Sequence, residues 1–139
     1  MGIIVFIMAV TTPHVEKFFA SQQRVLTEKT QYFYEELKQL RSQQSQVERT
    51  FEQEEKKARH VFFAAHADGP MQRSYVQSFL RRREQLQKTL HETLVERTAQ
   101  QHKALEVLKA QLAEDKRAYM EDLNHASAPD VKRFPYFRE

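Results

Sequence analysis

Histidines and carboxylates are the residues of this chain that could hold a metal ion or transfer a proton. Six histidines are present, at positions 14, 60, 66, 91, 102 and 125, but no two of them are four residues apart. A pair of metal ligands on one helix needs that spacing. The segment Asp122-x-x-His125 only approaches the Glu-x-x-His pattern of di-iron bundles, which require several such inputs. The sequence therefore predicts no metal and no other cofactor.

Nucleophilic and phosphate-loop chemistry find no support in the sequence either. The chain has no Cys and only two Gly, which excludes thiolate chemistry, disulfides and a glycine-rich phosphate loop. Adjacent carboxylates such as Glu35-Glu36 and Glu54-Glu55 diverge around a helix, so they do not converge on a substrate. We expect a protein that is not an enzyme.

An arginine triplet is the clearest candidate binding site of the basic residues. Arg81, Arg82 and Arg83 follow Tyr75 and Phe79 in the sequence, and guanidinium groups can hold phosphate or an acidic protein surface. The alternative is an ordinary solvated helix face. The net charge of +3 is compatible with acidic partners but does not single them out.

Long helices must position these residues, because only two Gly and four Pro interrupt 139 residues of which 29% are charged. Thr12 and Pro13 are typical of an N-cap and a first helical residue. Gly69 lies in an Asp-Gly-Pro turn cluster. The prediction is an apolar N-terminal tail (residues 1–12), a helical hairpin (13–126, with helix 13–67, turn 68–70 and helix 71–126) and an aromatic and basic C-terminal tail (127–139).

Apolar residues in the first predicted helix alternate at spacings of four and three, which is typical of a heptad coiled coil. The second helix is less regular and contains an eleven-residue step from Leu94 to Leu105. Folding the chain about Gly69 pairs residues whose numbers add up to about 138, such as Leu26 with Leu112 and Glu54 with Arg83. The predicted fold is all-α: a long antiparallel two-helix coiled-coil hairpin with short non-helical apolar tails at both termini.

A second apolar strip and both tails would gather at the end of the hairpin opposite the turn. One interpretation is that the tails fold back and close a small local core. The other is that these side chains insert into partner subunits, as large exposed apolar patches indicate. The candidate partner-binding residues are Phe18, Val25 and Tyr32 of the strip, Ile4 and Phe6 of the N-terminal run, and Phe134, Tyr136 and Phe137 of the C-terminal tail.

These features favour a non-catalytic structural or adaptor subunit of a cytoskeletal, ciliary or organellar complex, with the hairpin as spacer and the tails as anchors. Its expected partners are protein subunits, and a homodimer forming a four-helix bundle is an alternative. A ribonucleoprotein component that contacts RNA phosphates, and a helical-hairpin export chaperone or stalk, are also compatible with the sequence. The apolar run at residues 3–10 is too short to span a membrane and lacks a basic leader. We expect an intracellular protein that is not secreted.

Overall fold

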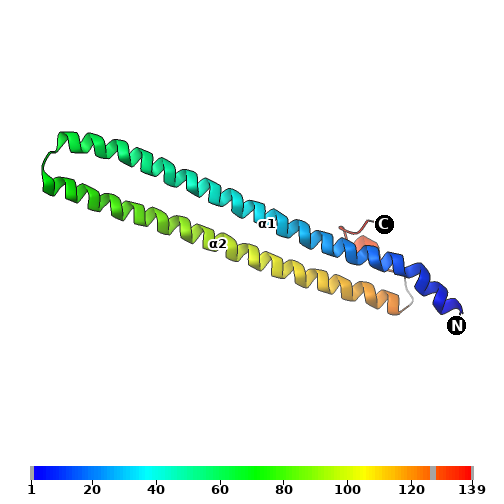
Figure 1. Cartoon of the computed structure of the whole chain (residues 1–139). Helices are drawn as coiled ribbons and strands as arrows, with labels where there is room; N and C mark the ends of the chain where they lie inside the picture. Colours follow the sequence, from blue (N-terminus) through cyan, green and yellow to red (C-terminus); the bar gives the residue numbers. More distant parts are fainter. Residues whose placement is uncertain (1, 126–127, 139) are drawn as a thin grey trace. The chain divides into compact units, whose positions relative to one another are not determined.

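A computed structural model shows an all-helical chain in which two long helices pack against each other as a hairpin (Figure 1). Helix α1 spans Gly2–Ala65, helix α2 spans Gly69–Asn124, and a short 3-10 helix, η1, spans Val131–Arg133. The structure describes the backbone of residues 2–125 and 128–138, and the side chains of residues 12–125 and 128–138. The predicted all-α fold, a hairpin of two long helices, is confirmed.

The start of the first helix differs from the expectation. Helix α1 begins at Gly2 and contains Pro13 in its interior, so residues 2–12, expected to form a non-helical tail, continue the helix. A proline inside a helix removes one backbone hydrogen bond and disturbs the preceding turn. No further Gly or Pro lies between Gly2 and Pro13, so the rest of this segment keeps its helical bonding.

The turn also lies earlier than expected, at residues 66–68 instead of 68–70, because Gly69 is the first residue of α2. The Asp68 carboxylate accepts a bond from the backbone N–H of Met71 at 3.4 Å, the usual role of an N-cap. Gln72 Nε2 closes the turn by donating to the carbonyl of His66 at 2.8 Å. The centre of the hairpin is therefore Ala67.

The contact strip of α2 follows an eleven-residue period. The strip of α1, which was predicted to be a heptad, follows the same period with Lys29 and Glu48 exposed at two of its positions. Buried and half-buried positions recur at steps of four, three and four residues. In α2 they are Phe79, Arg83, Leu86, Leu90, Leu94, Arg97, Gln101, Leu105, Leu108 and Leu112. Val47 and Val61, which the heptad placed inside, are 45% and 68% exposed. An eleven-residue repeat gives about 3.67 residues per turn, closer than 3.5 to a straight helix, so the strips need no left-handed supercoil.

The chain divides into two units, of which one comprises Met1–Phe33 and Gln101–Glu139, and the other Tyr34–Gln100. The second unit contains the turn. Its helices are held together by ring stacking, with Phe62 4.6 Å from Tyr75 and Phe51 5.7 Å from Phe79 between ring centroids. Stacked rings of this kind stabilise the pairing of the two helices near the turn.

An ion pair between a buried carboxylate and a half-exposed arginine also lies in this unit. Glu55 is only 5% exposed, and its Oε2 atom lies 3.3 Å from Nη2 of Arg82. The heptad pattern predicts instead that Glu54 faces Arg83. The eleven-residue period places Glu55, and not Glu54, on the inward face of α1. Its partner Arg82 is an exposed residue beside the contact strip of α2.

Glutamine side chains fix the register of the two helices. In the first unit, Gln22 Nε2 donates to the Leu112 carbonyl at 2.7 Å, and Gln101 Nε2 donates to the Phe33 carbonyl at 3.0 Å. In the second unit, Gln44 Nε2 donates to the Leu90 carbonyl at 2.8 Å. The residue numbers add up to 134 in each pair, four fewer than expected, because the hairpin centres on residue 67.

Candidate functional site

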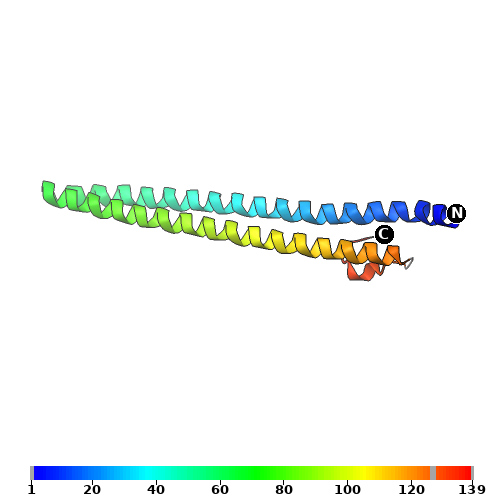
Figure 2. The ribbon, with the colours of Figure 1, turned by 90° about the horizontal axis from the view of Figure 1, so that it is seen from below.

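A buried aromatic cluster in the first unit contains the C-terminal segment, residues 128–138. Phe18 and Tyr119 are fully buried, and their rings stack with centroids 4.0 Å apart. Phe134 and Phe137 pack edge-on against Phe18 at 5.1 and 5.7 Å. In Figure 2 this segment, drawn in red, turns back along the end of α2. The interpretation that a tail folds back onto a local core therefore holds for the C-terminal tail.

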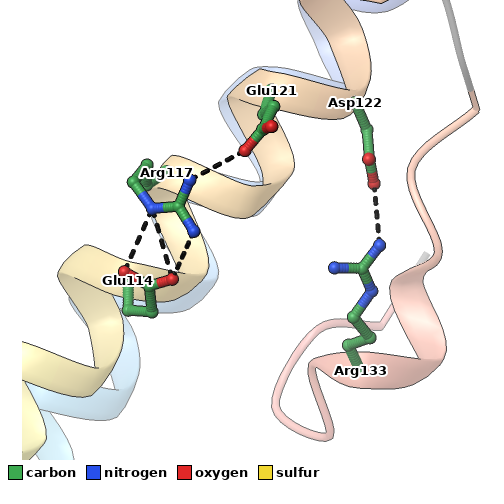
Figure 3. Close-up of polar contacts among 5 residues, drawn as sticks. All are labelled: Glu114, Arg117, Glu121, Asp122 and Arg133. Atoms are coloured by element: carbon green, nitrogen blue, oxygen red, sulfur yellow. Dashed lines mark hydrogen bonds and ion pairs between the residues drawn. The ribbon is translucent and has the colours of Figure 1, made fainter.

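Polar contacts attach the same segment to both helices. Arg24 Nη2 of α1 donates to the Tyr136 carbonyl at 2.5 Å, and the Tyr136 hydroxyl donates to Asp115 Oδ2 of α2 at 2.8 Å. Arg133 pairs with Asp122 at 3.3 Å (Figure 3). Three separate attachment points imply one preferred position for the segment.

Ionisation of Tyr136 is opposed by this packing. Burial is the main cause that raises its pKa to about 12, and the neighbouring Asp115 carboxylate contributes in the same direction. Nearby, Arg117 contacts Glu114 and Glu121 on the surface of α2 (Figure 3). Its hydrogen bond and positive charge hold the pKa of Glu114 below the usual value. These exposed pairs are ordinary i, i+3 and i, i+4 helix contacts.

The predicted partner-binding residues have different surroundings in the structure. Phe18, Phe134 and Phe137 are buried against one another, and Tyr136 is half-buried. Their aromatic faces are used within the chain, because the C-terminal segment covers the start of the apolar strip. Ile4 and Phe6 lie in α1, but their side chains fall outside the part that the structure describes.

The remainder of the apolar strip stays uncovered. Val25 is half-buried and Tyr32 is 58% exposed. Together with Glu28, Lys29 and Leu108 they line an open surface groove in the first unit. The ammonium group of Lys29 lies 5.3 Å from the centre of the Tyr32 ring. This groove, from here on the Val25–Tyr32 groove, is lined by both apolar and charged side chains.

The arginine triplet does not form one site. Arg82 is engaged by Glu55, and the guanidinium carbon of Arg83 lies 5.5 Å from the centre of the Phe79 ring. Only Arg81 is exposed without an acidic partner among the described residues. Consecutive helical residues point about 100° apart, so the three charges diverge.

Sequence reasoning missed other basic residues close to the turn. Lys56, Lys57 and Arg59 lie on α1 and Arg73 lies on α2. When charged residues are counted along each helix separately, the three on α1 and the one on α2 fall into different groups. Counting charge across the turn, from residue 56 to residue 83, would have found them.

Within residues 12–125 and 128–138, no group of three or more His, Asp or Glu side chains is arranged to hold a metal ion. No helix in the described part of the chain is long and apolar enough to cross a membrane. Comparison with protein-family models, with curated proteins and with solved structures gave no significant match. Arguments about function therefore depend on the surfaces of this chain alone.

Proposed function

We propose that the chain is a non-catalytic structural or adaptor subunit of a larger intracellular assembly, of the cytoskeletal, ciliary or organellar kind. The hairpin acts as a spacer, and the Val25–Tyr32 groove receives a partner subunit. The observation that supports this role most directly is the half-covered strip. Its first member, Phe18, is covered by the chain's own C-terminal segment, while Val25 and Tyr32 are left open.

The packing of the C-terminal segment on Phe18 supports aromatic anchors as ligands of this strip. The segment presents Phe134 and Phe137 to Phe18, and polar contacts from Arg24 and Asp115 orient it. A partner segment with one or two aromatic or aliphatic anchors would extend the same packing over Val25, Tyr32 and Leu108. Buried anchors of that type supply most of the free energy of protein association.

The two ends of the chain have different roles in the proposed assembly. The C-terminal segment buries its phenylalanines within the chain, so it completes the local core. The apolar N-terminal run at residues 3–10 remains a second candidate anchor on the basis of its sequence alone.

Native purification of the tagged chain from its source, with quantification of stoichiometric partners, tests the proposal. The wild-type chain is compared with a Val25→Ser, Tyr32→Ser double variant. A matched control, Val95→Ser with Val107→Ser, removes two other exposed apolar side chains. We expect a stoichiometric partner that the groove variant loses and the control retains.

Two outcomes would contradict the proposal. One is a wild-type chain that carries no stoichiometric partner, and the other is equal retention by both variants. Sedimentation velocity of the purified chain over a range of concentrations separates a second copy of this chain from a foreign partner. Helicity of each variant, measured by circular dichroism, excludes unfolding as the cause of a loss.

A further inference from the structure

Basic charge is concentrated at the turn end of the hairpin, residues 56–83. This segment holds seven Lys and Arg residues against a single acid, Asp68, which gives a net charge of +6. The whole chain carries +3, so the remaining residues together carry a net charge of −3. All of residues 56–83 belong to the unit that contains the turn. Glu54, Glu55 and Glu84 border this segment, so residues 54–84 carry a net charge of +3, and this local excess attracts an anionic surface.

Most of this charge is free to act outward. Lys56, Lys57, Arg73 and Arg81 are exposed, and within the described part of the chain none of them forms an ion pair. The one acid in the segment, Asp68, is used as the N-cap of α2. The cations at the turn end therefore lack internal neutralisation, in contrast to Arg82, which pairs with Glu55.

Exposed aliphatic side chains lie among these cations. Val61 is 68% exposed and Met71 is 44% exposed. Val61 lines an open groove on α1 together with Lys56, Lys57 and His60. Apolar side chains surrounded by Lys and Arg are typical of helices that rest on the surface of a bilayer, where the apolar groups enter the headgroup region and the cations contact lipid phosphates.

The aromatic residues at this end argue against single-stranded nucleic acid as the ligand. Phe62 stacks on Tyr75 at 4.6 Å and on His66 at 4.3 Å, and Phe63 packs edge-on against Tyr75 at 6.0 Å. Base stacking needs accessible aromatic faces, and these rings are half-buried by one another. The groups that protrude are aliphatic, which suits lipid better than bases.

We propose that the turn end of the hairpin, residues 56–83, binds the surface of an anionic lipid bilayer without crossing it. Lys56, Lys57 and Arg73 contact lipid phosphate and carboxylate groups, and Val61 and Met71 enter the headgroup region. This inference goes beyond the adaptor role, since it uses residues that the Val25–Tyr32 groove does not contain.

Co-sedimentation of the full chain with lipid vesicles tests the inference. Vesicles of phosphatidylcholine are compared with vesicles that also contain about 30% phosphatidylserine. We expect binding to the anionic vesicles only, and a decrease as salt is raised. Each Lys or Arg near such a surface contributes about 1 kcal/mol, so a Lys56→Gln, Lys57→Gln, Arg73→Gln variant should bind on the order of 100-fold more weakly.

A control of equal charge keeps the result specific to the turn end. Lys38→Gln, Arg41→Gln and Lys103→Gln remove three exposed cations outside residues 56–83 and should leave vesicle binding within about twofold of the wild type. A Val61→Ser, Met71→Ser variant keeps every charge and should weaken binding on the order of tenfold. The Val25→Ser, Tyr32→Ser variant should bind vesicles like the wild type, which separates this inference from the adaptor role.

Three results would overturn the inference. The first is equal binding to neutral and anionic vesicles. The second is an equal loss in the turn-end variant and its charge-matched control. The third is binding of a fluorescent polyuridine RNA that is tighter than vesicle binding and is lost in the turn-end variant, which would assign the surface to nucleic acid. Circular dichroism confirms that each variant retains its helices.

Discussion

Glu55 is a buried carboxylate within a narrow contact strip. Its Oε2 atom lies near Arg82 Nη2 and the Tyr75 hydroxyl, at 3.3 and 3.5 Å, while its Oε1 atom has no hydrogen-bond partner among the described residues. A buried charge with incomplete partners stabilises little, but it penalises any pairing that would separate it from its cation. We interpret Glu55 as a determinant of register more than of stability.

Replacing Arg82 and replacing Glu55 should therefore have different effects on the free energy of unfolding. Arg82→Leu leaves the carboxylate buried without its cation, and we expect it to lower the free energy of unfolding by about 1–2 kcal/mol. Glu55→Leu removes the buried charge and should be neutral or stabilising. Chemical denaturation followed by circular dichroism measures both values. Arg81→Leu serves as control and should stay within about 0.5 kcal/mol of the wild type; destabilisation by Glu55→Leu would contradict the interpretation.

Tyr136 predicts a pH dependence at alkaline pH. Its pKa in the folded chain is raised to about 12 from 10.0, so the unfolded chain loses this proton first. The stability that depends on the neutral hydroxyl is complete below about pH 10 and is lost as pH rises towards about 12. Thermal unfolding at about pH 9 and about pH 11 should show a steeper fall for the wild type than for Tyr136→Phe. Tyr34→Phe, at an exposed tyrosine, should keep the wild-type steepness, and equal slopes for all three proteins would refute the assignment.

At the scale of the helices, the period of the contact strip determines which paired deletions in α1 and α2 the hairpin tolerates. Deleting residues 40–50 and 84–94 removes one eleven-residue repeat from each helix and leaves Glu55 and Arg82 in place. We expect this variant to retain cooperative unfolding and full helicity per residue, because the remaining inward positions stay in phase.

The matched control removes seven residues from each helix, residues 40–46 and 88–94. A heptad coiled coil would accept this change, whereas in an eleven-residue strip the residues beyond the deletion are rotated by about 30° out of line with the rest. Thermal unfolding of this variant should occur at a lower temperature and over a broader range. If the seven-residue deletion variant were more stable than the eleven-residue deletion variant, the contact strip would be a heptad.

The position of the turn was predicted from the sequence more closely than the start of α1. Gly69 and Pro70 correctly indicated a single reversal, but the capping role of Asp68 moved the turn two residues towards the N-terminus. Pro13 was expected to start a helix that in fact begins at Gly2. Proline costs nothing at the first helical position but removes a hydrogen bond inside a helix, so the residue type favoured a helix start at Pro13 that the structure does not have.

The site was less predictable than the fold. The step from Leu94 to Leu105 already contained the eleven-residue period, but a heptad template treats it as a local irregularity. Phe134 and Phe137 were recognised as apolar, but composition does not say whether a phenylalanine packs against its own chain or a partner. Burial against Phe18 required the three-dimensional register.

For the whole molecule, the area left exposed to solvent is the informative quantity. The chain exposes 10689 Å², whereas a compact monomer of 16.6 kDa would expose about 7,600 Å². Large apolar side chains contribute to this area, among them Val61 at 68% and Val107 at 63% exposure. This excess favours a protein that gains stability when a partner covers part of it.

The same excess predicts a weak dependence of stability on denaturant. Because the denaturant slope scales with the area exposed on unfolding, we expect a guanidinium m-value roughly a fifth below that of a compact domain of equal length. Equilibrium unfolding at two protein concentrations measures it. A slope at or above that of a compact domain, or a midpoint that rises with concentration, would show that the chain buries further surface by self-association.

The residue numbers of each glutamine contact between the helices add up to 134, and this constant register has an evolutionary consequence. An insertion in only one helix would shift the register of every contact on the side of the insertion away from the turn. Equal insertions of one eleven-residue repeat in both helices would preserve these contacts. Homologues of different size should therefore show paired gaps of eleven residues, placed symmetrically about position 67. Such gaps would make the length of the hairpin a trait that evolves in discrete steps.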